Sequence, residues 1–184
     1  MEFVEPIKDI ESINKIKMLL RQESKRNYML FVLGINTGIR IHDLLNLRVK
    51  DIWDGSKAKD FLNIVGSETA IYLNDNVKEA LNSYLLDSDL GSNDFVFSTR
   101  KSDNPMSRQH AYRIINDAAK AVGVQGKVGT HTLRKTFGYH AYNKGIAISL
   151  IQTIYGHSCP SETLKYLGID QEEQKKQIKV DVRL

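Results

Sequence analysis

A histidine and an arginine at helical spacing are the first candidates for chemistry in this chain. His131 and Arg134 stand in the segment HTLRKTFGYH, three residues apart, so a helix would place both side chains on one face. Arginine presents a planar fork that matches two phosphate oxygens, and histidine exchanges a proton near neutral pH. The pair therefore suits chemistry on a phosphate, although a surface histidine beside a solvated arginine would have the same spacing.

Three further residues of suitable chemistry stand elsewhere in the chain. Arg40 lies at the entry to an apolar segment, where a charged group needs an anionic partner or access to solvent. Asp43 would either orient this guanidinium or merely neutralise it. His157 follows Gly156 at the end of an apolar run, and Tyr166 lies nine residues further on. Each of them alone has an ordinary explanation, as a salt bridge, a structural histidine or a packed aromatic ring.

The elements that must position these residues are mostly helical. Apolar residues recur at helical spacing, and the caps Asp9 and Ser107 precede two of the runs. Helices are predicted over residues 10–20, 26–36, 40–47, 75–86, 107–122, 131–143, 147–155, 161–167 and 171–178. Strands are predicted over 49–53, 61–65 and 70–73, with a brief extended piece at 95–97 and a tight hairpin turn at 66–69. The predicted fold class is mainly α with a small antiparallel β-sheet (α+β), in one domain.

Composition excludes several classes of protein. With 41% hydrophobic and 26% charged residues, the chain has the make-up of a globular domain. It holds no run of about 18 apolar residues that would cross a membrane, and its start lacks a secretion signal. One cysteine, Cys159, excludes an internal disulfide framework, and no Cys/His cluster has zinc spacing. We therefore expect a cytoplasmic protein without a metal or cofactor.

Charge is distributed unevenly along the chain. Residues 1–99 carry 12 Lys and Arg against 15 Asp and Glu, whereas residues 100–184 carry 14 against 7. A basic second half suits a polyanion such as DNA, whose phosphates supply much of the affinity of DNA complexes. A chance imbalance with a solvated basic face would explain the counts equally well. The candidate DNA contacts are Arg108 and Arg113, on the outer side of the predicted helix 107–122, and Lys135.

The order Arg…HxxR…GH…Tyr resembles the catalytic domain of the tyrosine recombinase (phage integrase) family. The matching segments are TGIRIHDLLNL around Arg40, HTLRKTFGYH around His131 and Arg134, and LIQTIYGHSCPSETLKYLGI around His157 and Tyr166. The resemblance extends from residue 5 to 170, nearly the whole chain. It implies double-stranded DNA as the partner, and site-specific recombination or integration by strand cleavage and rejoining.

The resemblance also implies a role for each matching residue. Tyr166 would be the nucleophile that attacks the scissile phosphate, forming a 3′-phosphotyrosine and releasing a 5′-hydroxyl. Arg40 and Arg134 would hold the non-bridging oxygens and stabilise the charge of the transition state. His131 would transfer a proton with the tyrosine, and His157 would hydrogen-bond the phosphate. Because the covalent link conserves the energy of the phosphodiester, rejoining would need neither ATP nor a metal.

One residue expected from the family is absent from its usual place. Family members carry a catalytic lysine in the turn of the β-hairpin, where it protonates the leaving 5′-oxygen. Here the turn is Gly66-Ser67-Glu68-Thr69, and losing a general acid typically slows a reaction by about 10²–10⁴-fold. Lys57 and Lys59 precede the first strand of the hairpin, and Lys59 is the possible substitute. Slow turnover, substitution by Lys59 and binding without cleavage all stay open.

The start of the chain also departs from the family pattern. Family members carry an N-terminal core-binding domain that closes around the other side of the DNA. Met1 stands almost at the start of the catalytic domain, so residues 1–184 are predicted to form one catalytic domain without that companion, unless the chain is a fragment. Such a half-clamp should bind DNA as a homo-oligomer or with a partner recombinase. Residues 171–178 and the basic tail would dock on a neighbouring protomer or pack on their own domain.

Three functions are compatible with these features. The first is an active integrase or recombinase of a mobile element, associated with the nucleoid. The second is a catalytically impaired accessory protein that occupies recombination sites, as the missing hairpin lysine suggests. The third is a type IB topoisomerase-like enzyme, which shares the chemistry. We rank the third lowest, because the segment around His157 and Tyr166 is integrase-like throughout.

Overall fold

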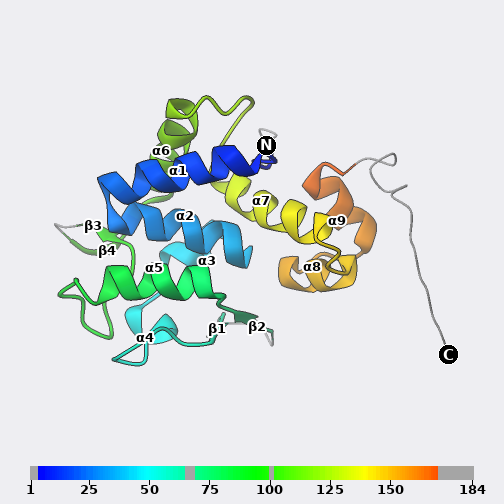
Figure 1. Ribbon diagram of the computed structural model, residues 1–184. Coiled ribbons are helices and arrows are strands. Elements are labelled where there is room, and N and C mark those ends of the chain that lie inside the picture. The colour runs from blue at the N-terminus through cyan, green and yellow to red at the C-terminus, as the bar shows by residue number, and fades with distance from the viewer. Residues whose placement is uncertain (1–3, 65–68, 100–101, 170–184) are drawn as a thin grey trace.

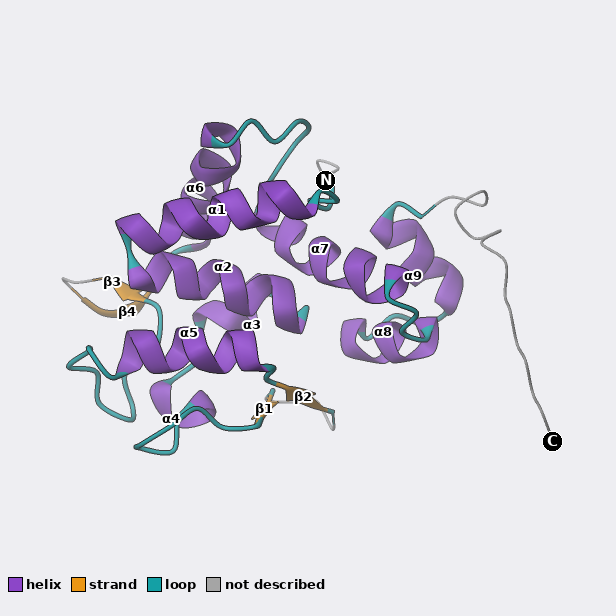
Figure 2. Cartoon of the chain, viewed as in Figure 1, coloured by secondary structure: helices purple, strands orange, loops and turns teal. Residues whose placement is uncertain are grey.

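The structure, a computed structural model, describes residues 4–64, 69–99 and 102–169, and helices form most of these ranges (Figures 1 and 2). The helices are α1 (Ile10–Glu23), α2 (Lys25–Thr37), α3 (Ile41–Leu45), α4 (Val49–Ile52), α5 (Asp75–Leu85), α6 (Arg108–Ala121), α7 (Thr130–Asn143), α8 (Ile148–Tyr155) and α9 (Pro160–Leu167). The strands are β1 (Phe61–Asn63), β2 (Ala70–Tyr72), β3 (Ser98–Thr99) and β4 (Ser102–Pro105). They form two antiparallel pairs, β1 with β2 and β3 with β4. The predicted class, mainly α with a small antiparallel sheet, is confirmed.

Polar caps begin two of the helices, as the sequence predicts. Asp9 accepts hydrogen bonds from the backbone N–H groups of Glu11 and Ser12 at the start of α1. The Ser107 hydroxyl accepts one from His110 at the start of α6, at 3.2 Å. These N–H groups have no partner within their own first turn, so the caps stabilise the two helices against fraying.

Helix α2 lies at the centre of the molecule. Its residues 29–33 are 0% exposed, and the helix packs against α1, α5 and α7 (Figure 1). Its apolar side chains divide between two clusters, one shared with α3 and α5 and the other with α1 and α6. Burying each aliphatic side chain contributes about 1.5–3 kcal/mol, so this body is a firm support for the Arg40 segment that follows α2.

The segment predicted as the strand 49–53 is a helical turn instead, and the prediction is wrong. The Arg48 N–H donates to the Asp51 carboxylate at 2.8 Å, and the Trp53 N–H donates to the Val49 carbonyl at 2.9 Å. Val49 and Ile52 are buried on the inner side of this turn. The local side-chain hydrogen bond and the burial therefore outweigh the β preference of the residue types.

The extended piece predicted at 95–97 is also placed differently. Phe95 forms an isolated bridge with Arg48, while Val96 and Phe97 lie in a buried turn. The strands come just after it, as the hairpin of β3 and β4, which the sequence did not predict. The hairpin segments are short and polar, and they lack the apolar alternation by which strands are recognised.

Helices α7, α8 and α9 form the part of the molecule on the right in Figure 1. Helices α8 and α9 pack on each other and on α7, around a separate cluster formed by Ile151, Tyr155, Leu167 and Ile169. Pro160 opens α9 at the first helical position, where its missing N–H costs no hydrogen bond. The predicted helix 171–178 and the turn residues 66–68 lie outside the described residues. Of the helices in the described ranges, none has the length and apolar content to span a membrane.

Candidate active site

Arg134 is the buried centre of the site. Its side chain is 7% exposed, and its Nη1 and Nη2 donate to the carbonyl oxygens of Gly38 and Tyr155 at 2.6 and 2.9 Å. These carbonyls lie at the C-terminal ends of α2 and α8, where a helix carries partial negative charge. Burial lowers the pKa of Arg134, while the nearby Tyr155 and Tyr166 raise it. The buried charge is therefore tolerated and its position is defined.

Arg40 approaches the same place from the start of α3. It is the exposed N-cap residue of α3, and its Nη2 lies 3.9 Å from the position that a Cβ on Gly156 would occupy. Burial lowers the pKa of Arg134 and raises that of Tyr166, and the charge of Arg40 lowers both. Two cationic groups held near one another in this way form a site suited to an anion.

His157 is held by the helix that carries Tyr166. Its Nδ1 lies 3.0 Å from the hydroxyl of Thr163, a fully buried residue of α9. Its ring packs edge-on against Tyr155 and Tyr166, with centroid distances of 5.3 Å to each. Burial lowers the pKa of His157, against the opposing charge of Glu162. When the Thr163 hydroxyl donates to Nδ1, Nε2 carries the proton of the neutral ring and can donate it to a ligand.

Tyr166 lies in α9 with its phenol turned inward. The hydroxyl oxygen is buried and has no hydrogen-bond partner among the described residues. Burial raises the pKa of Tyr166, while the charge and proximity of the Arg134 guanidinium lower it. The Tyr155 ring lies 5.5 Å away, centroid to centroid. Buried hydroxyls without a partner are uncommon in native proteins, so this one indicates a place for a ligand oxygen.

His131 and Asp43 lie at the margin of the site. His131 lies in the first turn of α7 with part of its surface open to solvent; partial shielding of the ring from water lowers its pKa, as do the charges of Arg108 and Arg134. Asp43 is half-buried in α3, and its charge raises the pKa of Arg134 against the larger effect of burial. In the described ranges no hydrogen bond or ion pair joins Asp43 to Arg40. The effect of Asp43 that the structure shows is thus on the pKa of Arg134.

The possible substitute lysine lies away from these groups. The ammonium of Lys59 donates to the carbonyl of Lys50 in α4. The structure therefore holds Lys59 at α4, and its predicted service as a general acid would require it to leave this position. The turn of the hairpin, where the family lysine would stand, falls outside the described residues.

The three predicted DNA contacts differ in position. Arg108 and Arg113 are exposed on α6, as expected from the helical pattern. Lys135 is 5% exposed, and its ammonium lies 5.0 Å from the centroid of the Tyr166 ring. The structure thus places Lys135 inside the site rather than on an outer surface. Its predicted contact with DNA stays a prediction.

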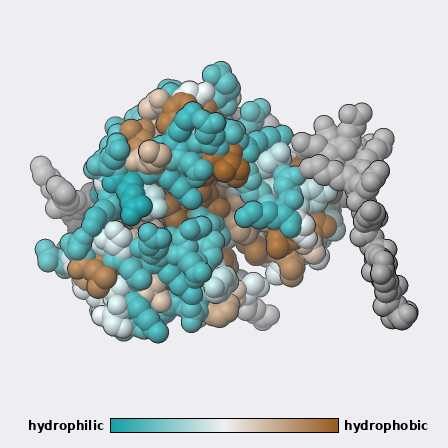
Figure 3. All heavy atoms as spheres, in the orientation of Figure 1, coloured by the Kyte–Doolittle hydropathy of each residue, from teal (hydrophilic) through white to brown (hydrophobic). Residues whose placement is uncertain are grey.

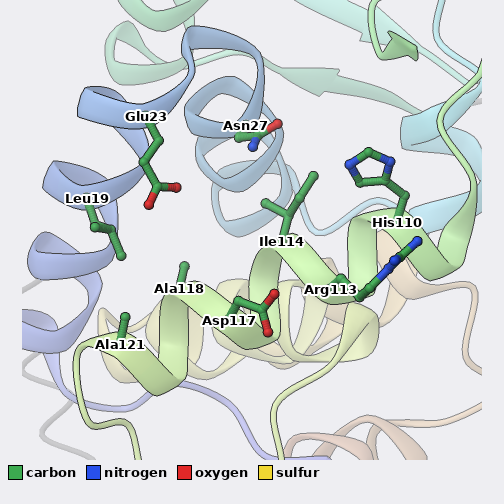
Figure 4. Close-up of a pocket in the computed structure, with 9 residues that line it drawn as sticks. All are labelled: Leu19, Glu23, Asn27, His110, Arg113, Ile114, Asp117, Ala118 and Ala121. Atoms are coloured by element: carbon green, nitrogen blue, oxygen red, sulfur yellow. The ribbon is translucent and has the colours of Figure 1, made fainter.

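The pocket drawn in Figure 4 lies elsewhere, between α1 and α6. It has a volume of 540 Å³, and its lining mixes apolar residues such as Leu19 with Glu23, Asp117 and Arg113. The carboxylates share these surroundings with Arg113, so part of its charge is offset locally. No residue of the Tyr166 site lines this pocket.

Two residues of the site were missed by sequence reasoning. Thr163 fixes one nitrogen of His157, and Tyr155 contacts three of the predicted catalytic residues. A polar residue one helical turn before Tyr166 was an available signal for Thr163. For Tyr155 the sequence shows only an aromatic residue at the end of a predicted helix. Its role could not be predicted, because the residues that it contacts come from distant segments.

The fold is that of a family of enzymes that cut and rejoin DNA strands. Residues 7–173 match the Phage integrase family, so the chain belongs to this family of tyrosine recombinases. It is 40% identical over 184 residues to the probable integrase/recombinase YoeC of Bacillus subtilis (strain 168), covering 98% of each chain. It is 28% identical over 167 residues to a tyrosine recombinase of Pseudothermotoga lettingae, covering 88% of this chain and 56% of the relative.

Solved structures support the same fold. The crystal structure of XerA recombinase superimposes with a TM-score of 0.76 at 24% identity, covering 96% of this chain and 63% of XerA. Recombinases and integrases bound to DNA are among the solved structures with this fold. The chain thus matches nearly all of YoeC, but spans little more than half of the other relative and under two thirds of XerA.

Proposed function

We propose that this chain performs site-specific DNA recombination or integration with Tyr166 as the nucleophile. The observation that carries the proposal is the buried, unpaired hydroxyl of Tyr166 beside the guanidinium of Arg134 and the ring of His157. A scissile phosphate at this point would receive the two arginines and the His157 donor. It would also bring its phosphorus to the phenol oxygen, as an in-line displacement requires.

The proposed reaction exchanges one phosphate ester for another. The Tyr166 oxygen forms a bond to phosphorus, the bond from phosphorus to the 5′-oxygen breaks, and a 3′-phosphotyrosine and a 5′-hydroxyl result. Because burial raises the pKa of Tyr166, its proton must pass to a base as the bond forms. Burial and nearby cations lower the pKa of His131, so its ring is neutral near pH 7 and can accept that proton.

The phosphate clamp follows from the donors left on Arg134. A guanidinium has five N–H groups, and the carbonyls of Gly38 and Tyr155 take one from each Nη. The remaining N–H groups, with Arg40, are proposed to bind the non-bridging oxygens and the charge that grows on them. Removing one such donor typically costs about 10²–10³-fold in rate.

The leaving 5′-oxygen also needs a proton. Lys59 is engaged at α4, so the proposal assigns it no part in the described arrangement. Cleavage is therefore expected to be slower than in family members that carry the hairpin lysine. The difference should be at most the factor of about 10²–10⁴ that a general acid supplies. The same reasoning expects rejoining, which reverses the step, to be slowed equally.

Double-stranded DNA is the proposed partner, bound by a homo-oligomer or together with a partner recombinase. The basic balance of residues 100–184 supports DNA. An apolar area over α8 in Figure 3, where Leu150 is 58% and nearby Ile146 46% exposed, supports contact with another protein chain. Residues 1–184 are proposed to act as one catalytic domain. The integrase and recombinase relatives favour this function over an accessory or topoisomerase-like role.

A trapping assay on nicked suicide DNA tests the proposal. The duplex would carry a site selected by the chain from a random library, and a nick would release the cleaved end so that the covalent adduct accumulates. Wild type and Tyr112→Phe, which alters an exposed tyrosine of α6, should form the adduct, whereas Tyr166→Phe should form none. An adduct in Tyr166→Phe would contradict the assignment. A wild type that shifts the DNA without any adduct would establish the accessory role instead.

A further inference from the structure

Tyr155 occupies the middle of the site although it is not one of the five residues that match the family pattern. It is 1% exposed, and its ring lies 4.2 Å below the Cζ of Arg134. The same ring packs edge-on against His157 and Tyr166, with centroid distances of 5.3 and 5.5 Å. The Tyr155 ring therefore contacts Arg134 of the proposed phosphate clamp, the proposed hydrogen-bond donor His157 and the proposed nucleophile Tyr166.

Tyr155 and Arg134 are also joined by a reciprocal pair of hydrogen bonds. The Tyr155 hydroxyl donates to the backbone carbonyl of Arg134, and Arg134 Nη2 donates to the backbone carbonyl of Tyr155 at 2.9 Å. With the cation–π contact, three interactions of different direction act between the same two residues. Together they restrict both the position and the plane of the guanidinium. A leucine at this place would fill the cluster but would supply neither the hydroxyl bond nor the cation–π contact.

Gly138 provides the space in which the Tyr155 hydroxyl lies. It stands one helical turn after Arg134, on the same side of α7. A Cβ at Gly138 would lie 2.2 Å from the Tyr155 hydroxyl oxygen and 2.6 Å from Cδ2 of Leu167. The first distance is far below van der Waals contact, and the ring is only 1% exposed and packed within its cluster. Tyr155 can therefore reach the Arg134 carbonyl only while residue 138 lacks a side chain.

We propose that Tyr155 is a positioning residue that aims the Arg134 guanidinium at the scissile phosphate, and that Gly138 is its obligatory companion. Tyr155 acts through Arg134 and does not itself touch the DNA. The inference rests on the proposed function for its consequence in catalysis, but the Tyr155–Arg134 contact can be tested by itself. Displacing a catalytic group by about 1 Å can cost about 100-fold in rate, so a small tilt of the guanidinium would be measurable.

Four variants separate positioning from packing. Tyr155→Phe keeps the ring and removes the hydroxyl, whereas Tyr155→Leu removes both contacts with Arg134. Gly138→Ala introduces the steric conflict with Tyr155. Ile151→Ala, in the same buried cluster on α8 but without a contact to Arg134, is the matched control for lost packing.

The first readout is the rate of covalent adduct formation at saturating DNA. Tyr155→Leu and Gly138→Ala should each lower this rate by about 10–100-fold, Tyr155→Phe by less, and Ile151→Ala by no more than about twofold. Equilibrium DNA binding should change little, because the clamp acts mainly on the transition state. The double variant Gly138→Ala/Tyr155→Leu should be no slower than either single variant, because leucine removes the conflict and the end of Leu167 can rotate. Multiplied losses in the double variant would overturn the pairing.

The second readout does not depend on cleavage. The Nε–H resonance of Arg134, assigned by its loss in Arg134→Lys, should be shifted by the Tyr155 ring in wild type. It should keep its position in Ile151→Ala and move in Tyr155→Leu. If wild type forms no adduct, the proposed function fails while this resonance still tests the contact. An Arg134 resonance unchanged in Tyr155→Leu would overturn the positioning role, whichever way the trapping assay turned out.

Discussion

In this site, burial and the nearby cationic groups set the pKa values of single side chains. The phenol of Tyr166 is buried without a hydrogen-bond partner, while Arg134 is buried with two carbonyl partners. The Tyr166 hydroxyl thus lacks a hydrogen-bond partner, whereas the Arg134 guanidinium is held in a fixed position. This arrangement is expected when a phosphate oxygen is to bind between them. The histidines belong to the same scheme, because burial keeps them neutral near pH 7.

The folding stability should therefore fall as the pH falls through the histidine range. Burial lowers the pKa of folded His157 below the unfolded value of 6.5, so below that value the unfolded chain binds the proton more readily. The stability contributed by the neutral ring is complete above pH 6.5 and is lost as the pH falls through the lowered folded pKa. Urea midpoints measured across this range should decrease, and His157→Gln should flatten the decrease. His42→Gln, at an exposed position in α3, is the control. Equal slopes in wild type and His157→Gln would contradict this assignment.

Among the elements, the junction between α2 and α3 connects the core to the site. Gly38 ends α2 with φ +65°, its carbonyl accepts from Arg134, and Arg40 follows it at the start of α3. A Cβ here would lie 2.3 Å from the Phe137 ring of α7, so the junction brings two helices into close contact. Both arginines therefore depend on one short segment of backbone.

Replacing Gly38 by alanine should destabilise the protein more than replacing another glycine of similar conformation. Gly145 has φ +84° with no atom within 4 Å of its Cβ position. Both alanines should lose about 1–2 kcal/mol to the left-handed conformation. Gly38→Ala should lose about 1–3 kcal/mol more through overpacking against Phe137. Urea unfolding of the two variants measures the difference, and equal losses would show that α7 can move aside freely. Gly38→Ala should also form the adduct more slowly.

The whole molecule consists of a large helical body and a smaller part formed by α8 and α9. Figure 1 shows these two helices beyond the end of α2, connected to the body through α7. Their buried residues form a cluster separate from the two clusters around α2. Because Tyr166 and His157 belong to this smaller part, its docking on Arg134 decides whether the site is assembled.

Hydrogen exchange should reveal the smaller part as a separate opening unit. Amides of α8 and α9 should exchange at least about tenfold faster than those of α2, because fewer apolar contacts must break to expose them. Mass spectrometry of peptides from both regions would measure this under native conditions. Binding of cleavable DNA should slow the exchange of α9 in particular. Identical protection in α2 and α9 would show that the molecule opens only as a whole.

The sequence alone determined most of the helices and identified the five candidate catalytic residues. Helical periodicity and caps such as Asp9 are local signals, so they predicted α1 to α3 and α5 to α9 to within a few residues. The five catalytic candidates could be named because their order along the chain matches a family. The roles proposed for them rest on that match and on the geometry that brings Arg134, His157 and Tyr166 together.

The tertiary structure decided what depends on contacts between distant segments. It made residues 49–52 helical, placed Lys59 at α4 and buried Lys135 beside Tyr166. It also paired Tyr155 with Gly138 around Arg134. The physical reason is that burial and close packing depend on which helices meet. A side chain's type records neither the neighbour that will cover it nor the space that this neighbour leaves.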